Sequence, residues 1–317
     1  MTILYNSYED IKNEYEKIRQ RNSFIVSERR DKVYRDYPEL REMDHKIFSM
    51  FVNIVKSRDD SDKAESFMQE LERYKALRKD FLKEHGIEDN YREAQYTCKK
   101  CKDTGFVNGK KCSCYVEKEI EMYDNISNFR KYIVSDNFAN LNMDYYRQEG
   151  YSDKYYNYMD RSIEEIKADI RDIDGKPFYY RFTGPPGTGK TFLSRCIGAE
   201  VLKHNKSVLY LNVTEYMDSL KPDHEGVSFK KYAILADLFI LDDLGTEYSS
   251  EFSRTEINYI IDKRLNDRKS MIITSNLMTD AIKLRYLPSM CSRIDNLFKE
   301  YYLSGEDLRR NVNASIK

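Results

Sequence analysis

The stretch "GPPGTGKT", Gly184–Thr191, constrains the fold of this chain more than any other stretch. It matches the pattern G-x-x-x-x-G-K-[ST] and lies between a strand-like run, "FYYRFT", and a helix-like run, "FLSRCIGAEVL". Glycines at this spacing let backbone N–H groups turn inward around phosphate oxygens at the positive end of a helix. The stretch therefore predicts a phosphate-binding loop that joins a strand to a helix in an α/β domain.

The side chains of this loop indicate a nucleotide triphosphate with a magnesium ion. Lys190 supplies positive charge to the β- and γ-phosphates, and the Thr191 hydroxyl can ligate Mg²⁺. ATP and ADP are the expected ligands. Their expected contacts are Gly184, Pro185, Pro186, Gly187, Thr188, Gly189, Lys190, Thr191, Phe192 and Asp242.

Polar residues at the ends of two later apolar runs extend this site. Asp242 and Asp243 follow "LFIL"; Asp242 can hold the Mg²⁺ ion together with Thr191, and Asp243 can polarise an attacking water. Asn276 ends "MIITSN" and can orient water near the γ-phosphate. Arg293 and Arg309 can stabilise charge on that phosphate, from the same subunit or a neighbouring one.

The second half of the chain alternates between strand and helix patterns. The predicted strands are 176–184, 207–213, 237–243 and 270–276, and the predicted helices are 162–173, 190–204 and 253–268. Alternating strands and helices form βαβ units, so we expect a mostly parallel sheet.

The first half of the chain has a helical pattern. Residues 1–95 contain only Gly86 and Pro38 among the residues that break helices. Apolar residues repeat at helical spacing over 11–18, 40–54 and 67–81, which predicts a small bundle or a helical hairpin. These apolar residues mainly indicate a hydrophobic core, although a bundle of this size often has an additional apolar face that binds a partner.

The boundaries of these helices have sequence signals of their own. Asp62 with Glu65 is the expected cap of the third helix, and Gly86 its expected stop. Another helix is expected over 117–134.

Four of the six cysteines gather in "CKKCKDTGFVNGKKCSC". Cys98 and Cys101 form one pair, and Cys112 and Cys114 form a second pair ten residues later. Four thiolates at this spacing can close a tetrahedron around Zn²⁺, with a small β-ribbon between the pairs. An iron–sulfur cluster is the alternative. A redox CxxC is disfavoured because it leaves the second pair unused.

Composition sets the broad class of protein. A chain of 317 residues with 40% hydrophobic and 34% charged residues is expected to fold into about two soluble domains. The net charge of −1 gives no global attraction to nucleic acid or membrane. The polar N-terminus resembles no signal peptide, so the expected location is the cytoplasm.

Taken together, these motifs resemble AAA+ ATPases, and more narrowly the bacterial replicative-helicase loaders of the DnaC/DnaI type. The resemblance rests on "YTCKKCKDTGFVNGKKCSC", "GPPGTGKTFL", "LFILDDLG", "IITSNL", "SRI" and "GEDLR", in that order. It implies a P-loop core with a parallel sheet, preceded by an all-α N-terminal domain and a four-cysteine zinc ribbon.

The resemblance also implies a role for each candidate residue. Lys190 and Thr191 match Walker A, and Asp242 and Asp243 match Walker B. The remaining matches are Asn276 to sensor 1, Arg293 to the trans-acting arginine finger and Arg309 to sensor 2. Most AAA+ members have Asp-Glu at Walker B, and the shorter second Asp predicts slow hydrolysis, which suits a switch.

The implied domains are a helicase-binding helical domain at 1–95, a zinc segment at 96–116, a connecting segment at 117–150 and an AAA+ domain at 151–317. The implied partners are the hexameric replicative helicase, single-stranded DNA and further copies of the chain through a shared ATP site, without a membrane. Lys221, Lys230, Lys231 and Tyr232 lie where such loaders contact DNA, although a solvated loop explains them equally well. Two alternatives stay open: a transposition-helper ATPase, and a nucleotide-binding adaptor without turnover.

Overall fold

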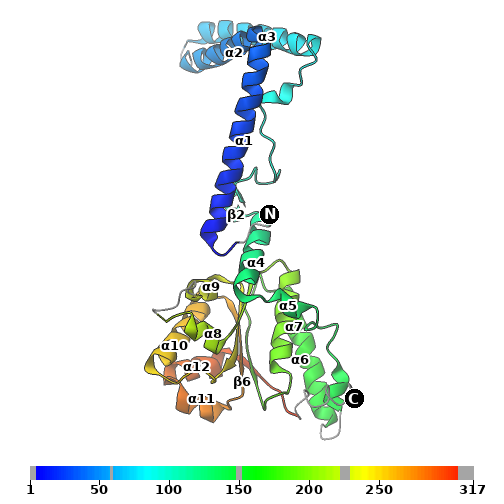
Figure 1. The fold of residues 1–317 in the computed structure, drawn as a ribbon, viewed down its shortest axis with the longest axis vertical. Coiled ribbons are helices and arrows are strands. Elements are labelled where there is room, and N and C mark those ends of the chain that lie inside the picture. The colour runs from blue at the N-terminus through cyan, green and yellow to red at the C-terminus, as the bar shows by residue number, and fades with distance from the viewer. Residues whose placement is uncertain (1–4, 58–59, 148–151, 222–228, 306–317) are drawn as a thin grey trace. The chain divides into compact units, whose positions relative to one another are not determined.

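The computed structural model describes residues 5–57, 60–147, 152–221 and 229–305 (Figure 1). These residues fall into two compact units. The larger unit is made of Met1–Ile11 and Ser113–Lys317, and the smaller unit of Lys12–Cys112.

A five-stranded parallel sheet forms the centre of the larger unit, with strand order β4-β5-β6-β3-β7. The strands are β3 (Tyr179–Thr183), β4 (Val208–Asn212), β5 (Leu238–Leu244), β6 (Ser270–Ser275) and β7 (Lys299–Tyr302). The four predicted strands and the parallel sheet are confirmed. The fifth strand, β7, was not predicted because its sequence, "KEYY", has charged residues at the exposed edge of the sheet.

Helices cover both faces of this sheet. Figure 1 shows α6 (Asp153–Arg171) and α7 (Lys190–Lys203) on one side, and α8 (Val213–Asp218), α10 (Glu251–Asn266) and α12 (Pro288–Leu297) on the other. Helices α9 (Lys230–Leu235) and α11 (Thr279–Arg285) complete this part of the unit. Strands that are buried on both faces need apolar residues at nearly every position, which explains the continuous run "LFIL" in β5.

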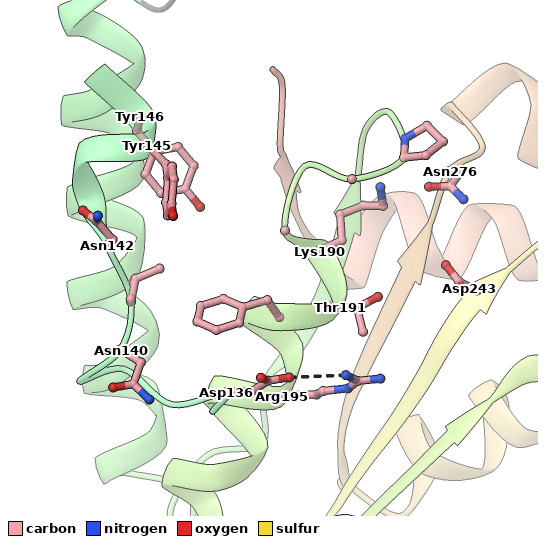
Figure 2. A pocket seen from close by; sticks show the side chains of 15 residues that line it. Asp136, Asn140, Asn142, Tyr145, Tyr146, Lys190, Thr191, Arg195, Asp243 and Asn276 are labelled. Atoms are coloured by element: carbon pink, nitrogen blue, oxygen red, sulfur yellow. Dashed lines mark hydrogen bonds and ion pairs between the residues drawn. The ribbon is translucent and has the colours of Figure 1, made fainter. Parts of the chain in front are cut away.

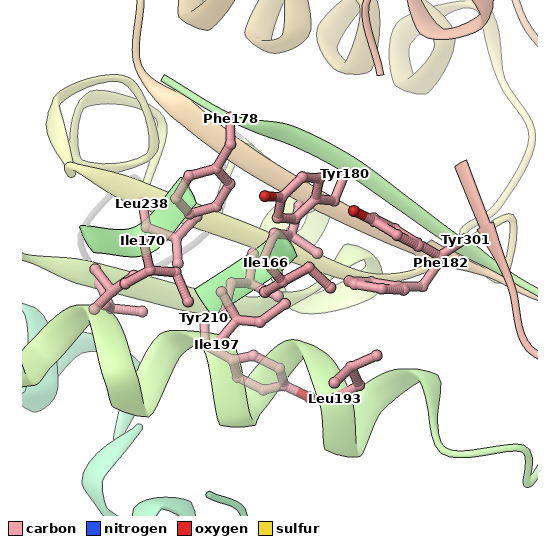
Figure 3. Packing of buried hydrophobic residues seen from close by; sticks show 14 of the residues in the cluster. Ile166, Ile170, Phe178, Tyr180, Phe182, Leu193, Ile197, Tyr210, Leu238 and Tyr301 are labelled. Atoms are coloured by element: carbon pink, nitrogen blue, oxygen red, sulfur yellow. The ribbon is translucent and has the colours of Figure 1, made fainter. Parts of the chain in front are cut away.

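The main core lies between the sheet and the pair α6 and α7. Side chains alternate between the faces of a strand, so every second strand residue points toward these helices. Figure 3 shows Tyr180, Phe182 and Tyr210 from the strands packing with Ile166 of α6 and Ile197 of α7. This core fixes the start of α7 at the carboxyl end of β3.

The smaller unit is helical, as predicted. Its helices are α2 (Pro38–Lys56), α3 (Ser61–Glu84) and most of α1 (Tyr8–Asp36), with the short η1 (Asp89–Arg92). Figure 1 shows α2 and α3 side by side as a hairpin. Its core is small, with Leu40, Leu82 and Tyr91 at the centre.

One predicted helix boundary in this unit is confirmed and another is wrong. Gly86 follows α3 with a φ of 64°, as expected of a helix stop. The cap of α3 is Asp60, whose carboxylate accepts a hydrogen bond from Lys63 N, and not Asp62. Asp62 lies inside the first turn, where its charge still favours the positive end of the helix.

The helix expected over 117–134 is broken. It forms α4 (Ser113–Ser127) and the single turn α5 (Arg130–Ile133). Asn128 separates them with a φ of 50°, a left-handed conformation that Asn tolerates better than most residues. A 3₁₀ turn, η2 (Met143–Arg147), follows.

Candidate functional site

The loop between β3 and α7 closes around the ammonium group of Lys190. Lys190 Nζ donates hydrogen bonds to the carbonyl oxygens of Gly184 (2.9 Å) and Pro185 (2.6 Å), and Lys190 is buried. All three glycines of the loop adopt positive φ angles: 138° at Gly184, 80° at Gly187 and 92° at Gly189. A Cβ atom on Gly184 would lie 1.9 Å from the carbonyl oxygen of Leu303, so a larger residue requires the backbone after β7 to move.

Thr191 and Asp242, the two predicted magnesium ligands, lie side by side. The Thr191 hydroxyl donates to Asp242, at 3.0 Å from Oδ1 and 3.2 Å from Oδ2. Asp242 is 3% exposed and accepts two further hydroxyl hydrogen bonds, from Thr274 to Oδ1 (2.6 Å) and from Tyr210 to Oδ2 (2.5 Å). A buried carboxylate with donors on both oxygens is held in one orientation, as a cation ligand requires.

Asp243 and Asn276 lie on the same side of the cavity as Thr191 (Figure 2). The backbone of Asp243 is left-handed, with a φ of 58°, and its N–H donates to Thr274 Oγ1 at 2.9 Å. The pairing of β5 with β6 shifts register between Leu241 and Leu244. Such an irregularity redirects a side chain at a strand end, and here it places the Asp243 side chain in the wall of the cavity.

The cavity above the loop has a volume of about 580 Å³, within the range of about 300–1,000 Å³ usual for small-molecule sites. Its lining residues are Asp136, Asn140, Leu141, Asn142, Tyr145, Tyr146, Pro186, Gly187, Gly189, Lys190, Thr191, Phe192, Arg195, Asp243 and Asn276. Predicted residues from three separate segments therefore meet in one pocket.

One wall of the cavity was missed by sequence reasoning, which treated residues 117–150 as a connecting segment. Figure 2 shows Asn140, Asn142, Tyr145 and Tyr146 facing the loop across the cavity. The Asn140 amide donates to the carbonyl oxygens of Val134 (2.9 Å) and Ser135 (3.0 Å), which fixes the turn before this wall. The Tyr- and Asn-rich composition of the segment was the available signal, since these side chains supply flat apolar faces and hydrogen-bonding tips.

The two candidate arginines lie outside this cavity or outside the described residues. Arg293 is on α12, where its Nε pairs with Asp262 Oδ1 at 2.6 Å and its side chain is 39% exposed. It is not among the lining residues of the cavity. Arg309 lies outside the described residues.

The candidate DNA-contacting residues are engaged in different ways. Lys230 pairs with Glu256 at 2.6 Å and lies 4.2 Å from the centre of the Tyr259 ring. Lys231 is exposed. Tyr232 is buried and stacks on Tyr8 with ring centres 6.0 Å apart, so its ring is not available to stack on a base. Lys221 pairs with Asp218 at 2.6 Å.

The four cysteines form one cluster. The sulfur atoms of Cys98, Cys101, Cys112 and Cys114 all lie within 4.8 Å of one another, and those of Cys98 and Cys112 are 3.8 Å apart. Zinc–sulfur bonds of about 2.3 Å in a tetrahedron place sulfur atoms about 3.8 Å apart. The donor set and its spacing therefore fit a single zinc ion.

The predicted β-ribbon between the cysteine pairs is confirmed as β1 (Phe106–Val107) paired antiparallel with β2 (Lys110–Lys111). Asp103, buried with a φ of 57°, organises the first pair. Its carboxylate accepts hydrogen bonds from Cys98 N (2.7 Å), Thr97 N (3.0 Å) and Asn22 Nδ2 (2.9 Å). The ligand loop is thus tied to α1 by a residue that sequence reasoning did not single out.

Across the described part of the chain, every helix is too short or too polar to traverse a lipid bilayer.

Comparison with known proteins supports these motifs over part of the chain. Residues 180–283 match the family described as IstB-like ATP binding protein. The replicative helicase loader DnaC of Escherichia coli K12 is 27% identical over 129 residues, which cover 39% of this chain and 53% of that protein. DnaC of Buchnera aphidicola, from Acyrthosiphon pisum, is 33% identical over 102 residues, covering 30% of this chain and 42% of that protein.

Two solved structures are similar to this chain over part of its length. The crystal structure of DnaI covers 56% of this chain and 92% of that chain, with a TM-score of 0.46 and 20% identity. The crystal structure of the DnaC helicase loader covers 45% and 89%, with a TM-score of 0.37 and 26% identity. The chain spans about half the length of the curated relatives it matches. Residues 180–283 are thus the core of an AAA+ ATP-binding domain of the IstB-like type, and the chain is a distant homologue of the DnaC-type replicative helicase loaders.

Proposed function

We propose that this protein is an ATP-switched factor that loads the replicative helicase onto single-stranded DNA in the cytoplasm. The observation that carries the proposal is the meeting of Lys190, Thr191 and Asp243 in the lining of one cavity of about 580 Å³, where Thr191 is also bonded to Asp242. Homology to proteins named as replicative helicase loaders supports the choice of partner.

Different residues of the site bind the phosphates and the magnesium ion of the nucleotide. The loop backbone and Lys190 hold the phosphates, while Thr191 and Asp242 hold the magnesium ion, which neutralises charge on the phosphates when bound. Lys190 Nζ, now bonded to Gly184 O and Pro185 O, exchanges these carbonyl oxygens for phosphate oxygens. The loop therefore changes its internal hydrogen bonds when nucleotide binds.

Hydrolysis depends on the residues at the far ends of β5 and β6. Asp243 accepts a proton from the attacking water, and Asn276 orients that water. We assign Arg293 to a site shared with a neighbouring copy, because it is not among the lining residues of its own cavity. Hydrolysis is slow because Asp243 reaches less far than a Glu would.

The cysteine cluster holds a structural zinc ion. Four sulfur atoms within 4.8 Å of one another enclose a single ion. An iron–sulfur cluster has several metal atoms between its cysteine ligands and would spread them further apart. With four protein ligands the ion has no open position, so its role is to stabilise the local fold.

The α2–α3 hairpin provides a surface for the helicase. Phe48, Phe51 and Val55 of α2 are 66%, 60% and 60% exposed. Their spacing of i, i+3 and i+7 places them on one face of the helix. An exposed apolar stripe of this kind costs solubility unless a partner covers it, and a helix or groove of the helicase is the partner we propose.

Native mass spectrometry of the full chain with its host's replicative helicase, with and without ATP, tests the proposal. We expect an ATP-sensitive complex with several loader copies per hexamer. Lys190→Ala should lose the ATP dependence, because it removes the charge that holds the phosphates. The absence of a complex in every nucleotide state would contradict the helicase assignment and direct the search to transposase partners.

The same experiment tests the α2 stripe. Phe48→Glu places a charge in the apolar stripe and should weaken the complex at least about tenfold, as for loss of an interface anchor. Phe24→Glu is the matched control, because Phe24 on α1 is also 66% exposed. Equal effects of the two substitutions would rule out a specific role for α2.

A further inference from the structure

Asp242 is at one end of a series of hydrogen-bonded side chains in the larger unit, in which Asp242 and Tyr210 are buried and Arg195 and Asp136 are half-buried. Tyr210 of β4 donates to Asp242 Oδ2 (2.5 Å), and Arg195 of α7 donates through Nη2 to the Tyr210 hydroxyl (2.6 Å). Arg195 also pairs through Nη1 with Asp136 Oδ2 at 3.3 Å, an interaction visible in Figure 2. We propose that Tyr210, held by Arg195, is the positioning residue for Asp242 and couples the magnesium side of the pocket to the wall that begins at Asp136. This inference rests on the proposed nucleotide binding.

The donor and acceptor of each hydrogen bond in this series of side chains follow from the chemical groups involved. A guanidinium group only donates, and an ionised carboxylate only accepts. The Tyr210 hydroxyl therefore accepts from Arg195 and must give its single proton to Asp242.

Tyr210 and Thr274 together fix the plane of the Asp242 carboxylate. Each donates a short bond to a different oxygen, 2.5 Å to Oδ2 and 2.6 Å to Oδ1. Thr191 shares its one proton between both oxygens at longer distances, 3.0 and 3.2 Å. A Thr191 hydroxyl that gives its proton to a fixed Asp242 must direct its lone pairs away from Asp242. Those lone pairs are what a magnesium ion requires.

The other end of the chain holds the opposite wall of the pocket. Asp136 lines the cavity at the start of the segment that continues to Asn140 and Asn142. The Arg195 guanidinium lies 3.7 Å from the centre of the Tyr132 ring and 4.7 Å from that of Tyr210, so it is also held by aromatic faces. A movement of this wall is therefore transmitted to Tyr210 through the guanidinium group of Arg195.

Tyr210→Phe tests the positioning role, because it removes the hydroxyl and keeps the ring. Tyr180→Phe is the matched control. Tyr180 lies on β3 of the same sheet, is buried, and donates to Asp169 at 2.5 Å, but neither residue lines the pocket. The measurement is binding of a fluorescent ATP analogue to the full chain as Mg²⁺ is titrated, with the thermal unfolding midpoint of each variant recorded alongside.

We expect Tyr210→Phe to raise the half-saturating Mg²⁺ concentration at least tenfold, which corresponds to about 1.4 kcal/mol. Binding of the analogue without Mg²⁺ should stay within twofold of the wild type. Tyr180→Phe should change neither quantity, even if it lowers the unfolding midpoint. An unchanged Mg²⁺ requirement in Tyr210→Phe, or an equal shift in both variants, would overturn the inference while leaving nucleotide binding intact.

Asp136→Asn tests the coupling from the other end without altering a magnesium ligand. It should raise the Mg²⁺ requirement in the same direction as Tyr210→Phe, and the double variant should show less than the product of the two effects, because both break one chain. Independent, multiplicative effects would overturn the coupling. A wild-type protein whose binding of the analogue ignores Mg²⁺ would overturn both the inference and the proposed magnesium site.

Discussion

Asp243 combines a left-handed backbone, with a φ of 58°, and a side chain in the wall of the cavity. This conformation is uncommon for a residue other than glycine, and Asn and Asp tolerate it best. Asn is therefore the substitution that removes the carboxylate charge without straining the backbone. A comparison of Asp with Asn at this position separates catalysis from folding.

We predict that Asp243→Asn lowers the ATP hydrolysis rate by about 100-fold or more, the usual contribution of a proton acceptor. Nucleotide affinity should be retained, because the phosphates are held by the loop and Lys190. The free energy of unfolding should change by less than about 0.5 kcal/mol. Steady-state phosphate release and a urea titration measure the two quantities, and an unchanged hydrolysis rate would remove Asp243 from the mechanism.

At the level of residues, the sequence is most informative where a motif has a fixed spacing. The loop glycines, Lys190 and the acidic pair each stand in a motif of fixed spacing, and the structure brings these segments to one cavity. Sequence reasoning did not identify Tyr210 and Arg195 as site residues, because neither belongs to a recognisable motif within its own strand or helix. The roles that we propose for them follow only from which strands and helices become neighbours, and that is decided by the tertiary fold.

Helix α7 approaches its neighbours so closely that a side chain at one position would force a neighbour to move. A Cβ atom on Gly198 would lie 2.6 Å from Phe129 Cζ and 3.0 Å from Ile240 Cδ1. A glycine inside a helix normally costs about 1 kcal/mol relative to alanine. Here the glycine allows α7 to contact Phe129, which is buried and immediately precedes α5. This contact holds in place the segment that leads to the pocket wall.

We predict that Gly198→Ala destabilises the larger unit by about 1–3 kcal/mol, because overpacking outweighs the gain in helix propensity. In a Phe129→Leu background the same substitution should be neutral or stabilising, since the smaller side chain leaves room for the methyl group. Urea unfolding of the four proteins measures this reversal. A stabilising effect of Gly198→Ala in the wild-type background would show that the contact is looser than described.

Helices and strands with a continuous apolar pattern were predicted better than an exposed edge strand or a helix interrupted at one residue. The four predicted strands have buried apolar runs, including β4 at one edge of the sheet, whereas β7 at the other edge has the mostly exposed sequence "KEYY". The helix expected over 117–134 is interrupted at one residue, Asn128. Its apolar pattern continues through the break, so periodicity alone does not reveal it.

At the scale of the whole molecule, the two units are stabilised by different means. The larger unit has an extensive core between its sheet and the helices α6 and α7. The smaller unit has a core centred on Leu40, Leu82 and Tyr91, together with a buried polar network in which Arg78 Nε donates to Asp44 at 2.8 Å. The ribbon strands between the cysteine pairs are two residues long, and Phe106 and Val107 are 45% and 40% exposed. The proposed zinc ion would therefore be the main source of stability for that ribbon.

These differences predict two separate unfolding transitions with separate ligand responses. Removal of zinc by a chelator should lower the first transition, because the ribbon loses the ion that replaces a core. ATP with Mg²⁺ should raise the second transition by mass action, since only the folded pocket binds nucleotide. Differential scanning calorimetry of the full chain, with one zinc per chain confirmed beforehand by elemental analysis, measures both. Cys112→Ser is the control, because chelation should then have no further effect on the first transition. A single transition that responds to both ligands would show instead that the metal and the nucleotide stabilise one cooperative structure.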